Sequence, residues 1–454
     1  MTEAKKTMSR REYMTTTPVP QLILKLSVPT IISMMVTAIY NTADTFFVAR
    51  VSHDPAVNTA ATASVGLVFT VMAIIQAFGF FFGHGSGNYL SRMLGAGNHK
   101  EADEMASTGF AMAVIVGIVF AIVGNIFVEP IADFLGATPT TLQFTKDYMR
   151  IILIGAPFMM AQFVINNQLR FQGSAVYAMV GLMSGAAMNM ILDPLLILVF
   201  HMEVRGAAIA TIMGQITSFM VLLVGTSKGE NIKMSIKNVH INRHYIYEVT
   251  NGGAPSLFRQ GLAAISTLLL NRTAGAIGGE AAIAGMSVAG RIMLMMGSAL
   301  IGFGQGYQPV CSFNYGAGLT KRVKEGFIFC VKWSTIFLLG IGTIFYIFAP
   351  QIIAFFSRDP VAIEVGVVAL RYMSLATPLS GAIVISNMML QSIGKGVKAT
   401  ITASARNGIC FIPLILILPQ FLGIRGVEMC QACADVLSLF IALPMAFSEL
   451  RKFD

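Results

Sequence analysis

The chain has 454 residues, of which 55% are hydrophobic and 12% are charged, and its mean hydropathy is +0.71. Soluble globular proteins carry about 25% charged residues, so this composition excludes that class. The apolar stretches are continuous rather than alternating, which excludes a membrane β-barrel. The formal charge of +9 lies mainly in loops between apolar runs, so we expect no nucleic-acid partner. The composition therefore indicates an all-α polytopic membrane protein.

Twelve apolar runs along the chain are each long enough to cross a membrane as a helix. A helix rises about 1.5 Å per residue, so roughly 20 residues cross a hydrocarbon core of about 30 Å. The runs lie at about 22–49, 58–83, 104–128, 147–171, 175–200, 205–227, 253–275, 281–308, 326–349, 371–393, 397–419 and 424–447. We therefore predict twelve transmembrane helices.

A polar, basic stretch divides these runs into six and six. The division predicts an N-terminal tail at 1–20, a first lobe at 21–227, a linker at 228–250, a second lobe at 251–448 and a C-terminal tail at 449–454. The N-terminal tail is basic and lacks the apolar core of a signal peptide. The loops on the side of this tail carry most of the lysines and arginines. Because such loops stay in the cytoplasm, we expect the linker and both termini there.

The two lobes repeat each other at a constant shift of 221 residues. This shift aligns Gly95 with Gly316 and Pro157 with Pro378, among other glycines and prolines. These residue types fix close approaches and backbone breaks, so their repetition indicates a duplicated fold. Six spans per lobe is an even number, so both lobes enter the membrane in the same direction. We expect a pseudo-two-fold axis along the membrane normal and a transport path between two six-helix bundles.

Polar side chains in the first lobe are predicted to gather at one depth. Asn189 and Asp193 lie four residues apart in the fifth span, hence on one face of a helix. A carboxylate inside a bilayer is costly unless it faces a cavity, a partner or a proton. Counted from the outer ends of their spans, Asp193, Asp44 and Thr211 all lie about 10 Å deep. Tyr40 lies one turn deeper than Asp44.

This cluster is predicted to bind a cation. Two neighbouring carboxylates in a low dielectric cannot both stay charged without a counter-ion. The cluster is therefore a proton acceptor or a Na⁺ site of hard oxygen ligands, and the sequence leaves both alternatives open; the ligands would be Asp44, Asn189, Asp193 and Thr211. Asn166 has a suitable side chain but lies nearer the cytoplasmic side. In the second lobe Leu414 stands where Asp193 is expected, and this asymmetry favours a coupling-ion site over structural pairing.

Other polar and flexible residues have plainer interpretations. Four residues are candidates for the wall of a substrate cavity: Met34, Met293, Gln260 and Gln305. Methionine suits an adaptable wall, whereas the glutamines would either line the cavity or cross-link helices. His84 is expected to be a packed or interfacial histidine. Asp435 is expected to pair with Arg406 or Arg425.

Several motifs along the chain carry a family resemblance. They are VPTIISMMVTAIYNTADTFFVAR in the first span, NNQLRFQG at the end of the fourth, MNMILDP in the fifth, GAAIAT in the sixth and GAPSLFRQG at the start of the second lobe. With twelve spans in two repeats, the sequence resembles the multidrug and toxic compound extrusion (MATE) family over essentially its whole length. The resemblance implies antiport, in which H⁺ or Na⁺ enters as an amphipathic, often cationic compound leaves.

The resemblance also assigns residues by position. It places Asp44, Asn189, Asp193 and Thr211 in the family's ion site, Tyr40 and Asn166 in its hydrogen-bond network, and Pro29 at a bend of the first span. Some branches of the family also carry acids in the seventh and tenth spans. This chain has Arg259 and Gln260 in the seventh span and no carboxylate there. It is therefore similar to the branch whose coupling site is confined to the first lobe.

We therefore expect a secondary active antiporter that exports amphipathic, cationic compounds by alternating access. It is expected to act as a monomer in the plasma membrane, the inner membrane of a bacterium, with small molecules and the lipid bilayer as partners. We expect no enzymatic activity and no cofactor beyond the coupling ion. The alternative is a flippase or exporter of lipid-linked or other endogenous metabolites, which would need a large basic groove; Arg259 and Arg291 are the main cations deep in the spans. The sequence does not identify the exported compound.

Overall fold

The structure is a computed structural model that describes the backbone of residues 9–48 and 55–453 and the side chains of residues 9–37 and 57–453. Over these ranges every regular element is a helix, which confirms the predicted all-α class. The first lobe comprises α2 (Val19–Val48), α3 (Pro55–Ala96), α4 (His99–Ile126), α5 (Val128–Phe134), α6 (Leu142–Phe171), α7 (Ala175–Pro194) and α8 (Glu203–Thr226). The second comprises α9 (Arg243–Gly316), α10 (Thr320–Ile347), α11 (Ala349–Phe356), α12 (Pro360–Ser392), α13 (Gly396–Ser404), α14 (Phe411–Leu422) and α15 (Ile424–Leu450).

Helix α9 contains two of the predicted spans. Gly279 has φ 66° and ψ −161°, a backbone conformation that only glycine adopts readily, and the chain turns back there. Eleven helices in the described residues are long and apolar enough to cross a membrane when α9 is counted once. Counting its two halves separately gives the predicted twelve. The first half begins at Arg243, inside the predicted linker, because the helix continues into the polar region beyond the apolar run.

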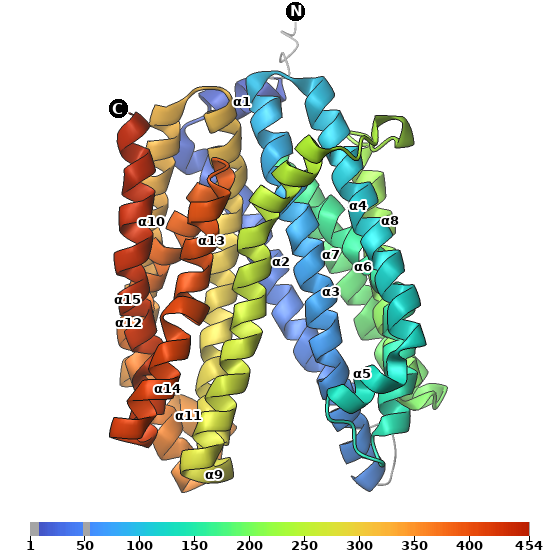
Figure 1. Cartoon of the computed structure of the whole chain (residues 1–454), viewed down its shortest axis with the longest axis vertical. Helices are drawn as coiled ribbons and strands as arrows, with labels where there is room; N and C mark the ends of the chain where they lie inside the picture. The colour runs from blue at the N-terminus through green and yellow to red at the C-terminus, as the bar shows by residue number, and fades with distance from the viewer. Residues whose placement is uncertain (1–8, 49–54, 454) are drawn as a thin grey trace, which may run out of the picture.

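The two lobes lie side by side and diverge away from the end that carries α1 and the C-terminus of α15 (Figure 1). At the closed end, each lobe approaches the other through a glycine. A Cβ on Gly95 would overlap the backbone oxygen of Phe313, and a Cβ on Gly316 would overlap the backbone oxygen of Arg92. These two contacts are equivalent under the sequence repeat. They support the predicted two-fold relation between the lobes.

A second pair of glycine contacts follows the same symmetry further along the helices. Gly85 of α3 lies against the backbone of Val249 in the first half of α9. Its repeat partner Gly306, in the second half of α9, lies against Ser27 of α2. The first helix of each lobe therefore packs on the second helix of the other. Without side chains at these glycines the four helices come close enough to seal one end of the molecule.

The predicted N-terminal tail contains a short helix that contacts both lobes, α1 (Arg10–Thr16). From the first lobe, Arg10 Nη1 donates to the carbonyl oxygen of Glu230 at 2.7 Å. From the second lobe, Asn314 Nδ2 donates to the carbonyl oxygen of Met14 at 3.2 Å, and Met14 is fully buried. The helix therefore braces the closed end.

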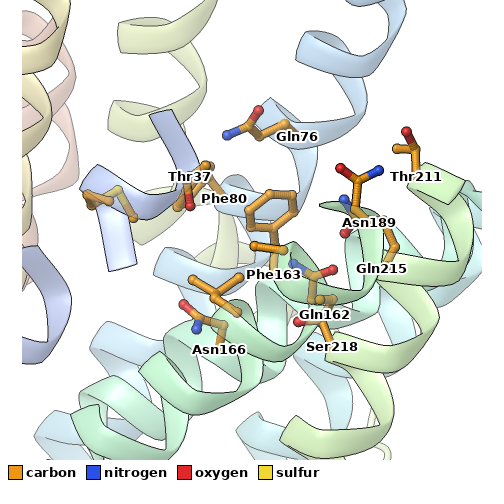
Figure 2. A pocket seen from close by; sticks show the side chains of 15 residues that line it. Thr37, Gln76, Phe80, Gln162, Phe163, Asn166, Asn189, Thr211, Gln215 and Ser218 are labelled. Carbon is orange, nitrogen blue, oxygen red and sulfur yellow. The ribbon is translucent and has the colours of Figure 1, made fainter. Parts of the chain in front are cut away.

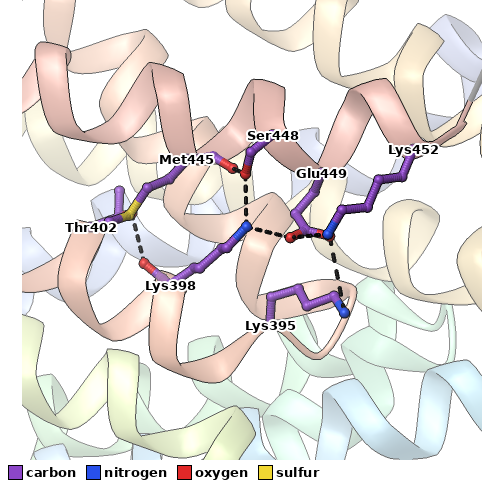
Figure 3. Close-up of polar contacts among 7 residues, drawn as sticks. All are labelled: Lys395, Lys398, Thr402, Met445, Ser448, Glu449 and Lys452. Atoms are coloured by element: carbon purple, nitrogen blue, oxygen red, sulfur yellow. Dashed lines mark hydrogen bonds and ion pairs between the residues drawn. The ribbon is translucent and has the colours of Figure 1, made fainter.

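The C-terminal end of α15 is fixed by charge at the same end of the molecule (Figure 3). Lys398 Nζ lies 2.5 Å, and Lys452 Nζ 2.9 Å, from one oxygen of Glu449, and Lys395 Nζ lies 4.0 Å from the other. Three lysines thus surround one carboxylate, which leaves a positive excess where α12, α13 and α15 meet.

We expect Gly95→Ala to hold the lobes apart at the closed end. The added methyl meets a backbone oxygen that no side-chain rotation can move away. Spin labels on His99→Cys and Lys321→Cys, two exposed positions at this end, should give a longer mean distance in the Gly95→Ala protein. Gly340→Ala is the matched control, because a Cβ there meets no atom within 4 Å. An unchanged distance in Gly95→Ala would contradict the assigned contact.

Candidate functional site

Asn189 and Asp193 are held side by side on α7, which continues as a π-helical turn over Leu195–Val199. Both side chains are buried, with 3% and 1% of their surface exposed. Asn189 Nδ2 donates to Asp193 Oδ1 at 3.5 Å. Pro194 has no N–H, so it interrupts the helical hydrogen bonds beside the carboxylate, and π-helical turns often mark functional sites.

Thr211 reaches the same region from α8. Helices α7 and α8 pack closely because glycines lie at their contact: a Cβ on Gly214 would lie 2.8 Å from the carbonyl oxygen of Gly185 and 3.1 Å from Cβ of Asn189. Thr211 is 6% exposed, and its hydroxyl donates to the carbonyl oxygen of Ala207 at 3.0 Å. Its oxygen lone pairs therefore remain available to accept a hydrogen bond or to bind a cation.

A small cavity lies inside the first lobe, between α2, α3, α6, α7 and α8 (Figure 2). Its volume is about 60 Å³, enough for a few water molecules or a partly hydrated monovalent cation. Three predicted site residues line it, namely Asn166, Asn189 and Thr211. The other lining residues are Met34, Thr37, Gln76, Phe80, Gln162, Phe163, Leu182, Gly185, Ala186, Gly214, Gln215 and Ser218.

The cavity concentrates polar atoms that lack hydrogen bonds. Four buried oxygens without a hydrogen-bond partner in the described residues belong to Gln162, Asn189, Gln215 and Ser218. Buried polar atoms are nearly always paired, so four at one cavity indicate that it accommodates water or a cation. The sequence analysis missed three of them. Helical spacing could have found two, because Gln215 lies four residues after Thr211 and Gln162 four residues before Asn166.

Two predicted site residues, Tyr40 and Asp44, have side chains that lie outside the described residues. The backbone of α2 is described as far as Val48. Thr37, earlier on this helix, lines the cavity, and Asp44 lies two turns further along the chain. Their membership of the site stays a prediction.

Asn166 takes part in a contact that both lobes contain. Its Nδ2 donates to the carbonyl oxygen of Ala178 at 2.9 Å and so ties α6 to α7. The repeat partner Asn387 donates in the same way to Ala399, which is the repeat partner of Ala178. A duplicated contact of this kind braces the helix pair. Only the oxygen of Asn166 is left for the cavity.

The four predicted wall residues lie in different places. Met34 lines the cavity of the first lobe. Met293 packs against the core of the second lobe, and Gln305 lies between the lobes, where it accepts a hydrogen bond from Arg170. Gln260 is half-buried on α9. The structure therefore does not bring these four residues together into one wall.

The plainer interpretations of His84 and Asp435 are confirmed. His84 is fully buried and stacks on Phe80, with ring centroids 5.3 Å apart. Asp435 accepts from Arg406 Nε at 2.7 Å, whereas Arg425 lies near Glu428 instead. In the described part of the chain, no three His, Cys, Asp or Glu side chains gather in a way that could hold a metal ion.

Comparison with known proteins places this architecture. The sequence model of the MatE family matches residues 29–195 and 255–417. The chain is 26% identical over 427 residues to the multidrug export protein MepA of Staphylococcus haemolyticus, which covers 94% of this chain and 93% of that protein. It is 26% identical over 444 residues to MepA of Staphylococcus aureus, with 96% and 95% covered. A solved multidrug resistance MATE family transporter in an outward-facing conformation has a TM-score of 0.90 at 24% identity, covering 100% of this chain and 99% of that one.

We expect Asn166→Ala and Asn387→Ala to destabilise the protein by similar amounts. Each removes a buried hydrogen bond that ties two helices together, which costs about 1–3 kcal/mol. Thermal unfolding of the purified protein should show comparable drops in Tm. Asn125→Ala is the control, since its amide bonds only to Ala121 within its own helix. A drop in Asn166→Ala with none in Asn387→Ala would contradict the equivalence of the two contacts.

Proposed function

Because the chain belongs to the MATE family, whose members are membrane transporters and not enzymes, we propose that it is a cation-coupled antiporter. It exports amphipathic, cationic organic compounds in exchange for H⁺ or Na⁺. The family match spans both lobes, and relatives that cover nearly the whole chain are named as multidrug export proteins, which supports multidrug efflux. The chain acts as a monomer, since one chain supplies both lobes of the path.

The closed end of the molecule is the cytoplasmic end in this proposal. It carries Arg10 and Arg11 of α1 and the lysines around Glu449, and positively charged segments stay in the cytoplasm. The divergence of the lobes away from this end then corresponds to an outward-facing arrangement in the plasma membrane (Figure 1). The bacterial origin of the MepA relatives supports that membrane.

One observation carries the coupling proposal: Asp193 and Asn189 are buried within a membrane span beside an oxygen-lined cavity. A carboxylate at this depth is stabilised by a proton or a cation. The cavity offers amide and hydroxyl oxygens, from Asn189, Thr211 and Gln215 among others, which are ligands that a hard cation such as Na⁺ prefers. The same oxygens would hydrogen-bond water that delivers a proton. Asp44 completes the cluster in the proposal.

Helix α2 links this site to the contact between the lobes. It packs against α7 of its own lobe and against α9 of the other. On α2, Ser27 and Ile31 meet Gly306 and Gly302 of α9, and Pro29 lies between them. Proline removes one hydrogen bond from the helix and lowers the cost of bending there. We therefore assign Pro29 as the hinge of α2.

Transport then follows from the charge of the site. In the outward-facing state, H⁺ or Na⁺ enters the cavity and neutralises the carboxylates, which changes the packing of α2 against α7 and α8. Movement of α2 at Pro29 alters its contact with α9, and the exported compound is released outside. The charged, unloaded site then favours uptake of the next compound from inside. Each step requires that neutralisation be worth more in one conformation than in the other.

We expect Asp193→Asn to abolish ion-driven efflux while leaving the protein folded. The amide keeps the shape of the side chain but cannot be neutralised by H⁺ or Na⁺. Export of a fluorescent lipophilic cation from proteoliposomes should fall at least about tenfold, which corresponds to about 1.4 kcal/mol or more. Asp147→Asn is the control, because its ion pair with Arg205 is at the surface and contributes about 1 kcal/mol or less. Full efflux by Asp193→Asn would refute the role.

We expect an imposed gradient of one of the two ions to drive uptake of the same cation into vesicles. Proteoliposomes are prepared with a pH gradient in one series and with a Na⁺ gradient in the other, at matched membrane potential. An ionophore that collapses the effective gradient should return transport to the level of protein-free vesicles. Transport that ignores both gradients would exclude antiport of either ion.

A further inference from the structure

A second buried polar cluster lies where the two lobes meet, at a distance from the cavity of the first lobe along α6. Its centre is Arg170 at the end of α6, which is 1% exposed. The guanidinium donates to Gln305 Oε1, on α9 of the other lobe, and to Asn167 Oδ1 at 2.5 Å. It also lies 3.3 Å from Nε2 of His84. A charged side chain of one lobe is therefore held between both.

The second lobe contributes a second arginine. Arg259 on the first half of α9 is half-buried and donates to Asn387 Oδ1 at 3.1 Å. It lies close enough for its charge to act on Arg170 and on His84. His84 adds no compensating charge. Its Nδ1 faces the carbonyl oxygen of Phe80 at 3.1 Å and so donates, which leaves Nε2 as the acceptor for the guanidinium of Arg170 and makes the ring neutral.

This cluster lacks the counter-ion that other buried arginines have. Arg92 pairs with Glu248 at 3.0 Å, and Arg406 pairs with Asp435 at 2.7 Å. Every hydrogen-bond partner of Arg170 and Arg259 among the described side chains is a neutral amide or imidazole. Arginine cannot lose its proton in proteins. An isolated buried charge is costly, so two of them close together favour an anion.

We propose that Arg170 and Arg259 bind a carboxylate of the exported compound, which would make zwitterionic amphipathic molecules the preferred substrates. The inference rests on the proposed export function and narrows its substrate class. Nε of Arg170 is buried without a hydrogen-bond partner in the described residues, and Arg259 bonds to a single amide, so donors remain on both groups. Guanidinium donors match the geometry of a carboxylate. A lipid-linked diphosphate would need more donors than these two groups leave.

The arrangement also suits release of the compound. One guanidinium comes from each lobe, so any movement of the lobes relative to each other changes the separation of the two arginines. A carboxylate that bridges them is bound best in one arrangement and less well in the other. That difference in affinity is what alternating access requires of a substrate site.

The test compares two rhodamines that differ in one group: one with a free carboxylate and its methyl ester. Equilibrium binding to purified wild-type protein should be tighter for the acid than for the ester. Arg259→Gln should weaken binding of the acid about tenfold or more, in line with loss of a charged hydrogen bond, and leave the ester unchanged. Arg259→Lys, which keeps the charge without the fork, should fall between. Arg291→Gln is the control, because Arg291 is an exposed arginine on the same helix.

The outcomes separate this inference from the proposed function. Equal affinity for acid and ester in the wild type, or equal loss of both in Arg259→Gln with an unchanged melting temperature, would overturn the carboxylate site. Displacement of the acid by a short-chain lipid phosphate that binds tighter than the acid would also overturn it, in favour of a lipid-linked substrate. Acid-selective binding that depends on Arg259, in vesicles where neither ion gradient drives transport, would confirm the site and refute antiport instead.

Discussion

The constraint on which this molecule depends is that a charge inside the membrane must be compensated. The described spans meet it in two ways. Asp435 is compensated permanently by Arg406, and such pairs hold the second lobe together without taking part in transport. Asp193 is placed instead beside a small cavity lined by neutral oxygens, where a proton or a metal cation can enter and leave. A compensating charge that can leave is what links the chemistry of an ion to the shape of the protein.

Duplication separates the parts of the molecule that hold it together from the parts that we assign to transport. The glycine contacts that seal one end occur twice, as Gly95 with Phe313 and Gly316 with Arg92. The asparagine that ties two helices also occurs twice. The buried acid of α7 occurs once, since its counterpart in the second lobe is Leu414. The repeat therefore supplies a symmetric frame, while function is assigned to positions where the two halves differ.

Helix α2 shows how the two kinds of position communicate. Its first half packs on α9 through glycines of the other lobe, and its later turns face the cavity through Met34 and Thr37. Pro29 lies at the contact between lobes, where one missing hydrogen bond makes the helix easier to bend. In our proposal this helix carries the effect of cation binding to the lobe interface. Arg170 and Arg259 lie at that same interface, where lobe movement would act on a bound substrate.

The sequence alone determined the class, the twelve spans, the two-fold repeat and the pairing of Asn189 with Asp193. These follow from hydropathy, from the spacing of glycines and prolines, and from the helical period, all of which are local properties of the chain. Only the tertiary structure decided that Gln162, Gln215 and Ser218 share the cavity and that Asn166 braces two helices. It also separated the four predicted wall residues and brought Arg170 to Gln305 of the other lobe. Those facts depend on how helices rotate and cross, which one chain's periodicity does not specify.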